Sequence, residues 1–287
     1  MKKLSILFSM LIFVALLLSA CGGGADATAK EVPAAEGGDK CSVQNLPLNE
    51  AGKLTVATGD PVFEPWMVDD DPSNAKGYES AFVYALAEEM GFSAEDVQWV
   101  RTSFDEAISP VEKPYDFNIQ QYTITEERDK VVDFSDPYYT VQQAVVTLAD
   151  SPVANATTLA ELRDARFGAM VGTTDLDTIE KVIGAKDVAV YNTVADVLTA
   201  MNAGQIDATV IALPSAYYFV AVQLDNGKIV GILPQEIDED FGMLFTDGSK
   251  LIPCVNQALQ TLKDNGTMDD LVVKWLQAGG DIPTISK

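Results

Sequence analysis

This 287-residue chain contains no histidine, so its candidates for acid–base or nucleophilic catalysis are limited chiefly to carboxylates, hydroxyls and three cysteines. Ser-His-Asp and Cys-His catalysis and histidine-ligated metal sites are therefore excluded. The sequence also has no Gly-x-x-x-x-Gly-Lys-Ser/Thr loop for ATP phosphates. Asp60, Glu64 and Glu79 are the acids available for catalysis, but they form no distinctive pair. We expect no enzyme activity, no cofactor and no bound metal.

Cys21 follows Leu18–Ala20 at the end of an uncharged apolar run that begins after Lys2 and Lys3. A cationic start, an apolar run and small residues at its end are typical of a secretory signal peptide. The run is short for a membrane span. The cysteine after the small residues resembles a bacterial lipobox, in which Cys21 would take a diacylglycerol and become the mature N-terminus. An uncleaved anchor with a buried Cys21 is the alternative, and both place the remaining chain outside the cytoplasm.

The segment after Cys21 has too few large apolar residues to build a core. We therefore predict a signal peptide at residues 1–20 and a lipidated flexible tether at residues 21–40. If Cys21 carries the lipid, Cys41 and Cys254 remain in an oxidising compartment, where we predict one disulfide between them. Two free buried thiols are the alternative.

The charge of the chain limits its partners. It has 43 acidic and 19 basic residues, which gives a formal net charge of -24. Such a surface repels phosphate backbones, so we expect no nucleic-acid partner.

Strands and helices are predicted to alternate in two sets. The predicted strands are residues 53–58, 97–100 and 117–121 in the first set and residues 166–171 and 208–212 in the second. Apolar residues at helical spacing lie between them, as at Phe82, Ala85, Leu86 and Met90. This alternation predicts α/β architecture with parallel sheets covered on both faces.

Two runs near the middle of the chain are its most distinctive motifs, Thr-Ile-Thr-Glu-Glu-Arg at 123–128 and Asp-Phe-Ser-Asp-Pro-Tyr-Tyr at 133–139. Shorter matches are Ser103–Asp105, Gly172–Thr174 and Gly204–Ala208. From about Lys53 to Leu276 the chain resembles the solute-binding proteins of amino-acid ABC transporters, bacterial extracellular solute-binding protein family 3.

The resemblance implies a two-lobed clamshell of the periplasmic-binding-protein type. Each lobe would be a mixed, mostly parallel sheet flanked by helices. Lobe 1 would hold residues 41–144 and 246–287, and lobe 2 would hold residues 145–245. Strands near 144–148 and 242–245 would form a two-strand hinge, and the predicted disulfide would lie within lobe 1.

The resemblance also implies that Arg128 binds the carboxylate of an amino acid, for which its planar fork of donors is suited. A surface pair of Arg128 with a neighbouring glutamate is the alternative. Thr123 would add a hydroxyl. Thr173 and Thr174 would complete the site at a strand-to-helix turn, where peptide N–H groups bind anions. A simple helix cap at Thr173 is compatible with that role.

Other residues are candidates for the walls of the same site. Phe63, Trp66 and Phe104 would exclude water from the ligand, although each could belong to the core. Gln120 and Gln121 stand where the family has small residues. Their amides either read a polar ligand side chain, or one of them faces away.

Two positions depart from the family pattern. The family has an aspartate for the ligand's α-ammonium where this chain has Ala212. Asp60, Glu64 or backbone carbonyls must then receive the ammonium, or the ligand lacks one, because an unpaired buried ammonium is costly. Glu79 is expected to serve a helix N-terminus rather than the ligand.

The expected function is an extracellular, lipid-anchored solute-binding protein of an ABC importer. It would capture an amino acid or a similar small carboxylate, deliver it to permease subunits and act as a monomer. The alternatives are a ligand sensor for a signalling partner, or a carboxylate-dependent dehydratase or lyase on the same fold.

Overall fold

The computed structural model describes residues 40–234, 239–277 and 280–287. The predicted signal peptide, Cys21 and nearly all of the predicted tether lie outside these residues. Among the residues described, no helix has the length and apolar composition needed to cross a bilayer. Two five-stranded sheets with separate hydrophobic cores organise this part of the chain. We call the elements around them the first half and the second half.

The first sheet has the strand order β2-β1-β3-β12-β4. Its strands are β1 (Leu54–Thr58), β2 (Val97–Arg101), β3 (Phe117–Asn118), β4 (Val132–Phe134) and β12 (Leu244–Thr246). β1 pairs in parallel with β2 and β3, whereas β12 is antiparallel to β3 and β4. The sheet is therefore mixed, as predicted.

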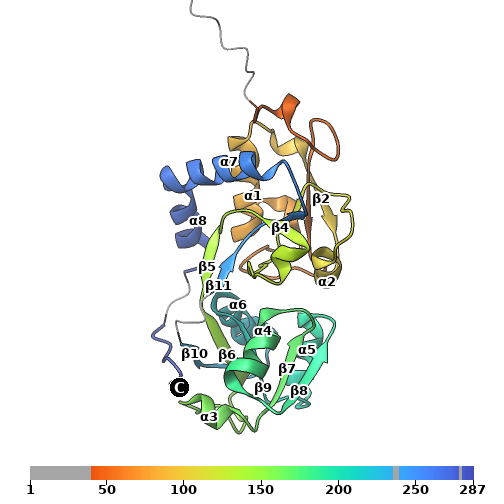
Figure 1. The fold of residues 1–287 in the computed structure, drawn as a ribbon. Coiled ribbons are helices and arrows are strands. Elements are labelled where there is room, and N and C mark those ends of the chain that lie inside the picture. Colours follow the sequence, from red (N-terminus) through yellow and green to blue (C-terminus); the bar gives the residue numbers. More distant parts are fainter. Residues whose placement is uncertain (1–39, 235–238, 278–279) are drawn as a thin grey trace, which may run out of the picture. The chain divides into compact units, whose positions relative to one another are not determined.

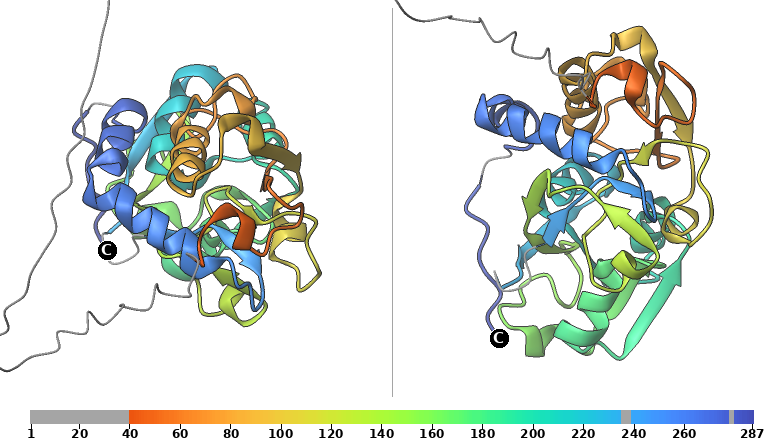
Figure 2. Two further views of the ribbon diagram at one scale, coloured as in Figure 1. Left: turned by 90° about the horizontal axis from the view of Figure 1, so that it is seen from above. Right: turned by 45° about the horizontal axis from the view of Figure 1, so that its top comes forward.

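Helices flank this sheet because their apolar faces are buried by packing against it. They are α1 (Tyr78–Glu89), α2 (Phe104–Ile108), α7 (Ile252–Asp264) and α8 (Thr267–Trp275), with short 3₁₀ turns η1 (Val43–Asn45), η2 (Pro72–Asn74), η3 (Ala94–Asp96) and η4 (Arg128–Lys130). α1 packs against α7 and α8 (Figure 2). The predicted face of α1 is confirmed, since Phe82 and Leu86, one turn apart, are fully buried. Cys41 and Cys254 form the predicted disulfide, which ties the N-terminal segment to α7.

The second sheet has the strand order β10-β6-β9-β7-β8. Its strands are β6 (Gln143–Leu148), β7 (Arg166–Met170), β8 (Asp187–Tyr191), β9 (Ala208–Ala212) and β10 (Gly227–Ile232). Its helical segments are α3 (Leu159–Leu162), α4 (Thr174–Asp177), η5 (Thr178–Ile183), α5 (Val194–Asn202), α6 (Leu213–Tyr218) and η6 (Phe219–Gln223). β7 is parallel to β8 and β9, and β6 is antiparallel to β9 and β10.

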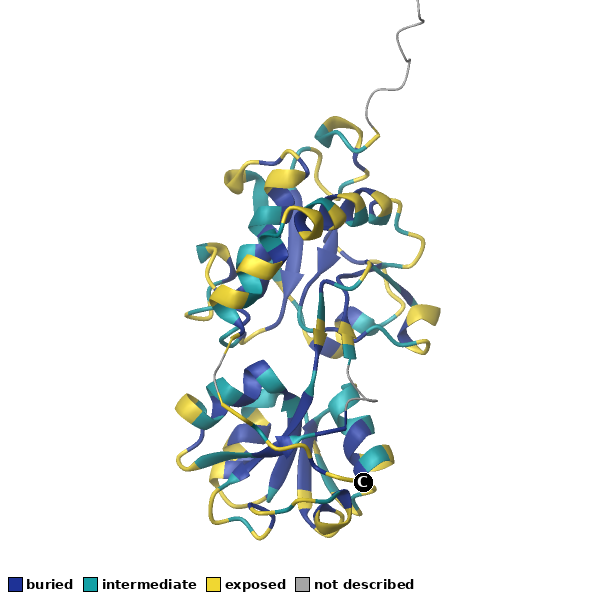
Figure 3. Ribbon diagram, turned by 90° about the vertical axis from the view of Figure 1, so that its left-hand side faces the viewer, coloured by how far each residue is buried: buried dark blue, intermediate teal, exposed yellow. Residues whose placement is uncertain are grey.

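Both faces of the second sheet are covered. Along β6, Val145 belongs to one hydrophobic cluster, whereas Ala144 and Val146 belong to another. This alternation follows from the two-residue period of a strand, which sends successive side chains to opposite faces. Figure 3 shows the result, with buried strands and helices that expose their outer faces.

The connection between the halves differs from the predicted one. The strands that join them are β5 (Tyr139–Val141) and β11 (Glu239–Phe241), which pair antiparallel in a separate two-stranded sheet (Figure 1). The segments predicted as the hinge, 144–148 and 242–245, lie largely within β6 of the second sheet and β12 of the first. The predicted segments are therefore the continuations of the joining strands into the two sheets, and extended sequence does not show where one strand ends and the next begins.

The C-terminal segment was expected in lobe 1, and this expectation was wrong. Thr284 bridges to Ile232, and Ser286 bridges to Thr158 beside α3 (Figures 1 and 2). Ile285 is 1% exposed and joins the hydrophobic cluster of the second half. It fits because Gly231 has no side chain, and a Cβ there would lie 2.7 Å from Ile285 Cγ1. Burial of this side chain and backbone hydrogen bonds to Ile232, Thr157 and Leu159 thus hold residues 283–286 against the second half.

Candidate functional site

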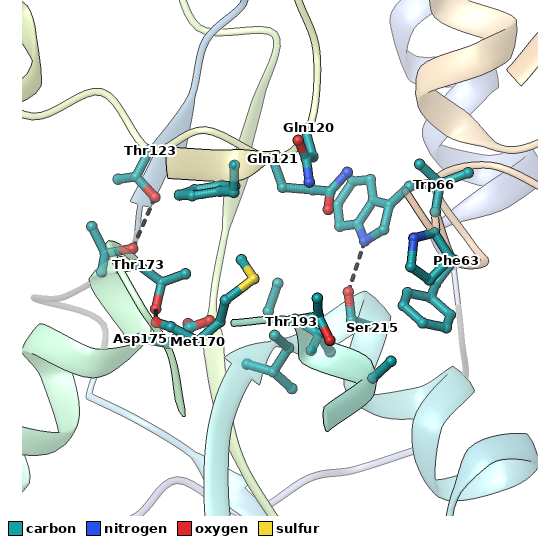
Figure 4. Close-up of a pocket in the computed structure, with 18 of the residues that line it drawn as sticks. Phe63, Trp66, Gln120, Gln121, Thr123, Met170, Thr173, Asp175, Thr193 and Ser215 are labelled. Atoms are coloured by element: carbon teal, nitrogen blue, oxygen red, sulfur yellow. Dashed lines mark hydrogen bonds between the residues drawn. The ribbon is translucent and has the colours of Figure 1, made fainter. Parts of the chain in front are cut away.

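A cavity of about 150 Å³, which we call the pocket, is lined by residues of both halves (Figure 4). All ten residues predicted to contact a ligand line it, namely Asp60, Phe63, Trp66, Phe104, Gln120, Gln121, Thr123, Arg128, Thr173 and Thr174. Thr123 and Thr173 lie at one end, and Phe63 and Trp66 lie at the other. Glu64, the weaker acidic candidate, is not among the lining residues.

Arg128 is positioned by the turn that precedes it. The Thr125 hydroxyl accepts a hydrogen bond at 3.2 Å from the N–H of Arg128, which is the first residue of η4. Arg128 is 7% exposed, and its guanidinium carbon lies 5.4 Å from the centre of the Phe104 ring. It donates to the Thr123 carbonyl at 2.7 Å and to the Gly172 carbonyl, in the second half, at 2.9 Å. The alternative of a surface pair is therefore wrong.

Thr123 and Thr174 meet from opposite halves. Their hydroxyl oxygens are 3.1 Å apart, and each donates to Glu239 Oε2, at 2.7 Å and 3.0 Å. Thr173 has a different role, because its hydroxyl accepts from the Leu176 N–H and caps α4. The expectation that Thr173 caps a helix is confirmed, and Thr173 also lines the pocket.

The two neighbouring glutamines have different partners. Gln121, at φ 51°, donates its backbone N–H to Glu79 at 2.9 Å and its side-chain amide to the other oxygen of Glu79. Gln120 Oε1 accepts from the Tyr122 hydroxyl at 3.1 Å. Both glutamines line the pocket, but the Gln121 amide is engaged by Glu79, whereas the Gln120 oxygen is engaged by Tyr122.

Glu79 lies in the first turn of α1, but its side chain does not serve the helix end as expected. It is 1% exposed and also accepts a hydrogen bond from the Tyr138 hydroxyl. Burial raises the pKa of Glu79 to about 7, although three hydrogen bonds to the carboxylate act in the opposite direction. Glu79 therefore supports the left-handed backbone of Gln121 from below the pocket.

The aromatic residues belong to both core and pocket. Trp66 is 2% exposed and donates from Nε1 to the Ser215 hydroxyl, on α6 of the second half, at 2.7 Å. Phe63 packs edge-on against Phe219, with ring centres 5.5 Å apart. Phe104 stacks on Tyr122, and the Arg128 guanidinium lies over the Phe104 ring. Asp60 is exposed at the rim.

Sequence reasoning missed two carboxylates in the pocket, Asp175 and Glu239. The Gln143 side-chain amide donates to both, at 3.0 Å and 3.1 Å, and its oxygen accepts from Thr178 at 2.8 Å. Burial is the main cause that raises the pKa of each carboxyl, Asp175 well above its usual range. Asp175 directly follows the predicted Gly172–Thr174 turn, which was a usable signal. Nothing in the sequence marked Glu239.

Ala212 also lines the pocket, so the missing family aspartate would have faced this space. Across the described ranges, no group of three acidic or cysteine side chains is arranged to hold a metal ion.

Comparison with known proteins places the chain among binding proteins. Residues 54–278 match the family model described as bacterial extracellular solute-binding proteins, family 3. The chain is 25% identical over 270 residues to a probable histidine-binding protein of Neisseria gonorrhoeae, with 93% of each covered. It is 24% identical over 281 residues to an ABC transporter glutamine-binding protein of Bacillus subtilis, with 96% of this chain and 98% of the relative covered.

Solved structures agree with the sequence relatives. An ancestral arginine-binding protein bound to glutamine has a TM-score of 0.68 and 29% identity, with 79% of this chain and 98% of that chain covered. The matched residues contain nearly all elements of both sheets and the pocket between them. The chain belongs to family 3 of the bacterial extracellular solute-binding proteins.

Proposed function

We propose that this protein captures a free amino acid in the pocket and that Arg128 binds its carboxylate. One observation carries the proposal: Arg128 is buried in a pocket, but it is absent from the ion pairs formed by the described residues. A guanidinium has five N–H donors, and two protein carbonyls occupy only part of them. A ligand carboxylate would supply a direct ion-pair partner through two parallel hydrogen bonds.

The other lining residues take roles that follow from their positions. Thr123 and Thr174 come from opposite halves, so a ligand that contacts both favours the arrangement in which the halves meet. Phe63 and Trp66 would pack against the ligand's side chain and exclude water. Trp66 also joins the halves, through its hydrogen bond to Ser215.

We assign the residues from 41 to the end of β5, and those from β12 to α8, to lobe 1.

Transport follows from the family, in which amino-acid-binding proteins serve ABC importers. We propose that β5 and β11 are the hinge, that the ligand-bound form docks on a permease, and that the protein acts as a monomer. We also propose that a lipid on Cys21 holds it on the outer face of the cell membrane. Metabolic labelling with a radioactive fatty acid tests this, because the Cys21→Ala variant should lose the label.

Isothermal titration calorimetry with each of the twenty L-amino acids tests the central proposal. We expect one-to-one binding of at least one of them by the wild-type protein, and recovery of that amino acid unchanged by mass spectrometry. Arg128→Ala should abolish binding, whereas Arg163→Ala, a control outside the pocket, should bind normally. Thermal melting shows whether each variant is folded. Equal binding by folded Arg128→Ala, or conversion of the ligand, would overturn the proposal.

A further inference from the structure

The pocket contains opposite charges that do not pair with each other. Arg128, Asp175 and Glu239 all line it, yet the ion pairs found in the described part of the chain join none of them to a partner within 4.0 Å. Their polar contacts are instead with neutral hydroxyls, amides and carbonyls. Among the described residues, Arg128 and the two acids therefore have no direct ion-pair partner, although they interact electrostatically across the cavity at longer range.

The two sites are neighbours because they share one residue. The Thr123 carbonyl accepts from Arg128 at 2.7 Å, and the Thr123 hydroxyl donates to Glu239 at 2.7 Å. An α-amino acid carries its carboxylate and its ammonium on the same carbon, so its two charges need adjacent sites. A simple carboxylic acid would neutralise Arg128 and leave both acids without a cation.

Gln143 fixes the positions of the two acids. It is 1% exposed, and both amide hydrogens are used, one for Asp175 Oδ1 and one for Glu239 Oε1. Its own oxygen accepts from Thr178, so the amide cannot turn without losing that bond. In the described structure Asp175 Oδ2 accepts no hydrogen bond, and Asp175 lines the pocket. An ammonium has three donors, which this oxygen and the remaining lone pairs can accept.

We infer that Asp175 and Glu239, held together by Gln143, bind the α-ammonium of the ligand in place of the acid that Ala212 lacks. This inference rests on the proposed function and deepens it, because it names the residues that receive the ammonium of the amino acid. The pair occupies α4 and β11, whereas Ala212 ends β9. The negative charge for the ammonium has thus moved toward the hinge strand.

Proton release is a consequence of this arrangement. The charged groups around the pair are Arg128 on η4 and Asp177 on α4, besides the two carboxyls themselves. Burial favours the neutral form of both carboxyls in the empty pocket, whereas an adjacent ammonium favours the ionised form. Binding should therefore transfer a proton from a carboxyl to the buffer, and affinity should rise with pH until the pair of the empty protein is already ionised.

The test uses the wild-type chain, Asp175→Asn, Glu239→Gln and the control Glu180→Gln, which removes an exposed charge from η5 outside the pocket. Calorimetry with the twenty L-amino acids identifies the tightest binder. Its analogue without the α-amino group is then titrated, for example 5-guanidinopentanoate for L-arginine or imidazolepropionate for L-histidine. Titrations in phosphate and in Tris buffer give the number of protons released.

We expect the wild-type protein to bind the amino acid about 30-fold or more tightly than the analogue, since a buried charge partner is lost. Asp175→Asn and Glu239→Gln should weaken binding of the amino acid and reduce proton release, with little change for the analogue. Ala212→Asp in the Glu239→Gln background should restore part of the affinity. Glu180→Gln should match the wild type.

Equal affinity of the wild-type protein for the amino acid and its analogue would overturn the inference. So would unchanged preference in both carboxylate variants. In either case the proposed function stands if Arg128→Ala still abolishes binding. If none of the twenty amino acids binds the wild-type protein, both proposals are wrong.

Discussion

The two ends of the pocket are built by different physical means. At the polar end, hydrogen bonds hold Arg128, Thr123 and Glu239 in fixed positions before any ligand is present. At the aromatic end, Phe63 is half-buried and is held by packing against Phe219. Preorganised polar groups suit the part that all amino acids share, because little further ordering is needed on binding. Packing alone constrains the side chain less, so we assign ligand discrimination to the aromatic end.

The largest effect is expected from Arg128→Lys, which keeps the charge but removes the planar fork. Lysine cannot donate two parallel hydrogen bonds to a carboxylate or maintain the contacts with both protein carbonyls. Affinity for every amino acid should fall by more than about a hundredfold, the range seen when a buried charge partner is lost. Calorimetry measures this, with Arg163→Lys as the matched control. A selective loss for one amino acid would contradict the assignment of Arg128 to the shared part.

The next effect concerns the buried support of the polar end, Glu79. Its pKa of about 7 in the folded protein lies above the ordinary value of 4.5, so the folded state binds the proton more tightly. Its contribution to stability is present below pH 4.5 and is lost as the pH rises toward 7. From pH 5 to 7 this contribution should change by about 2 kcal/mol.

Urea unfolding of the wild-type protein and Glu79→Gln at several pH values isolates that contribution as a difference. The difference in free energy of unfolding between the two proteins should vary with pH in this window. A difference that does not depend on pH would show that Glu79 does not titrate there. Glu88→Gln, an exposed position on the same helix, is the control.

A smaller effect is expected from Ser215→Ala, which removes the acceptor of the Trp66 N–H. A buried donor without a partner costs about 1–3 kcal/mol. The loss of this hydrogen bond destabilises the arrangement in which the two halves meet. Affinity should therefore decrease by about fivefold or more for all ligands. The tryptophan fluorescence of the protein should also change, because Trp66 loses its hydrogen-bond partner. Ser249→Ala, remote from the pocket, should leave affinity and fluorescence unaltered.

The smallest effect on mean affinity is expected from Phe63→Leu. An aromatic pair contributes about 0.5–1.5 kcal/mol beyond its buried area. We expect the order of preference among the twenty amino acids to change, with affinities altered by about two- to tenfold. Competition binding across the panel measures the order. A uniform loss would mean that the aromatic end does not discriminate between ligands.

Local sequence patterns predicted much of this structure. The helix face at Phe82 and Leu86 follows from spacing alone, and the turn Gly172–Thr174 lies next to the pocket as the motif implied. Arg128 was identifiable because the Thr-Ile-Thr-Glu-Glu-Arg run resembles the family motif, and within this run the Thr125 hydroxyl accepts a hydrogen bond from the Arg128 N–H. These features depend on residues close together in the sequence.

The missed features depend on residues far apart in the sequence. Glu79 and Gln121 are 42 residues apart, and Gln143 and Glu239 are 96 residues apart. The direction of the Gln121 side chain and the presence of an acid from β11 in the pocket both depend on where the two crossing strands lie. Local sequence patterns do not predict that position. The return of Ile285 to the second half likewise depends on the space above Gly231.

A crystal structure of the wild-type protein with its tightest-binding amino acid tests the central claim most directly. We predict that the ligand carboxylate accepts two hydrogen bonds from the Arg128 guanidinium and that the ligand side chain points toward Phe63 and Trp66. A ligand whose carboxylate lies away from Arg128, or one bound outside this pocket, would contradict the account.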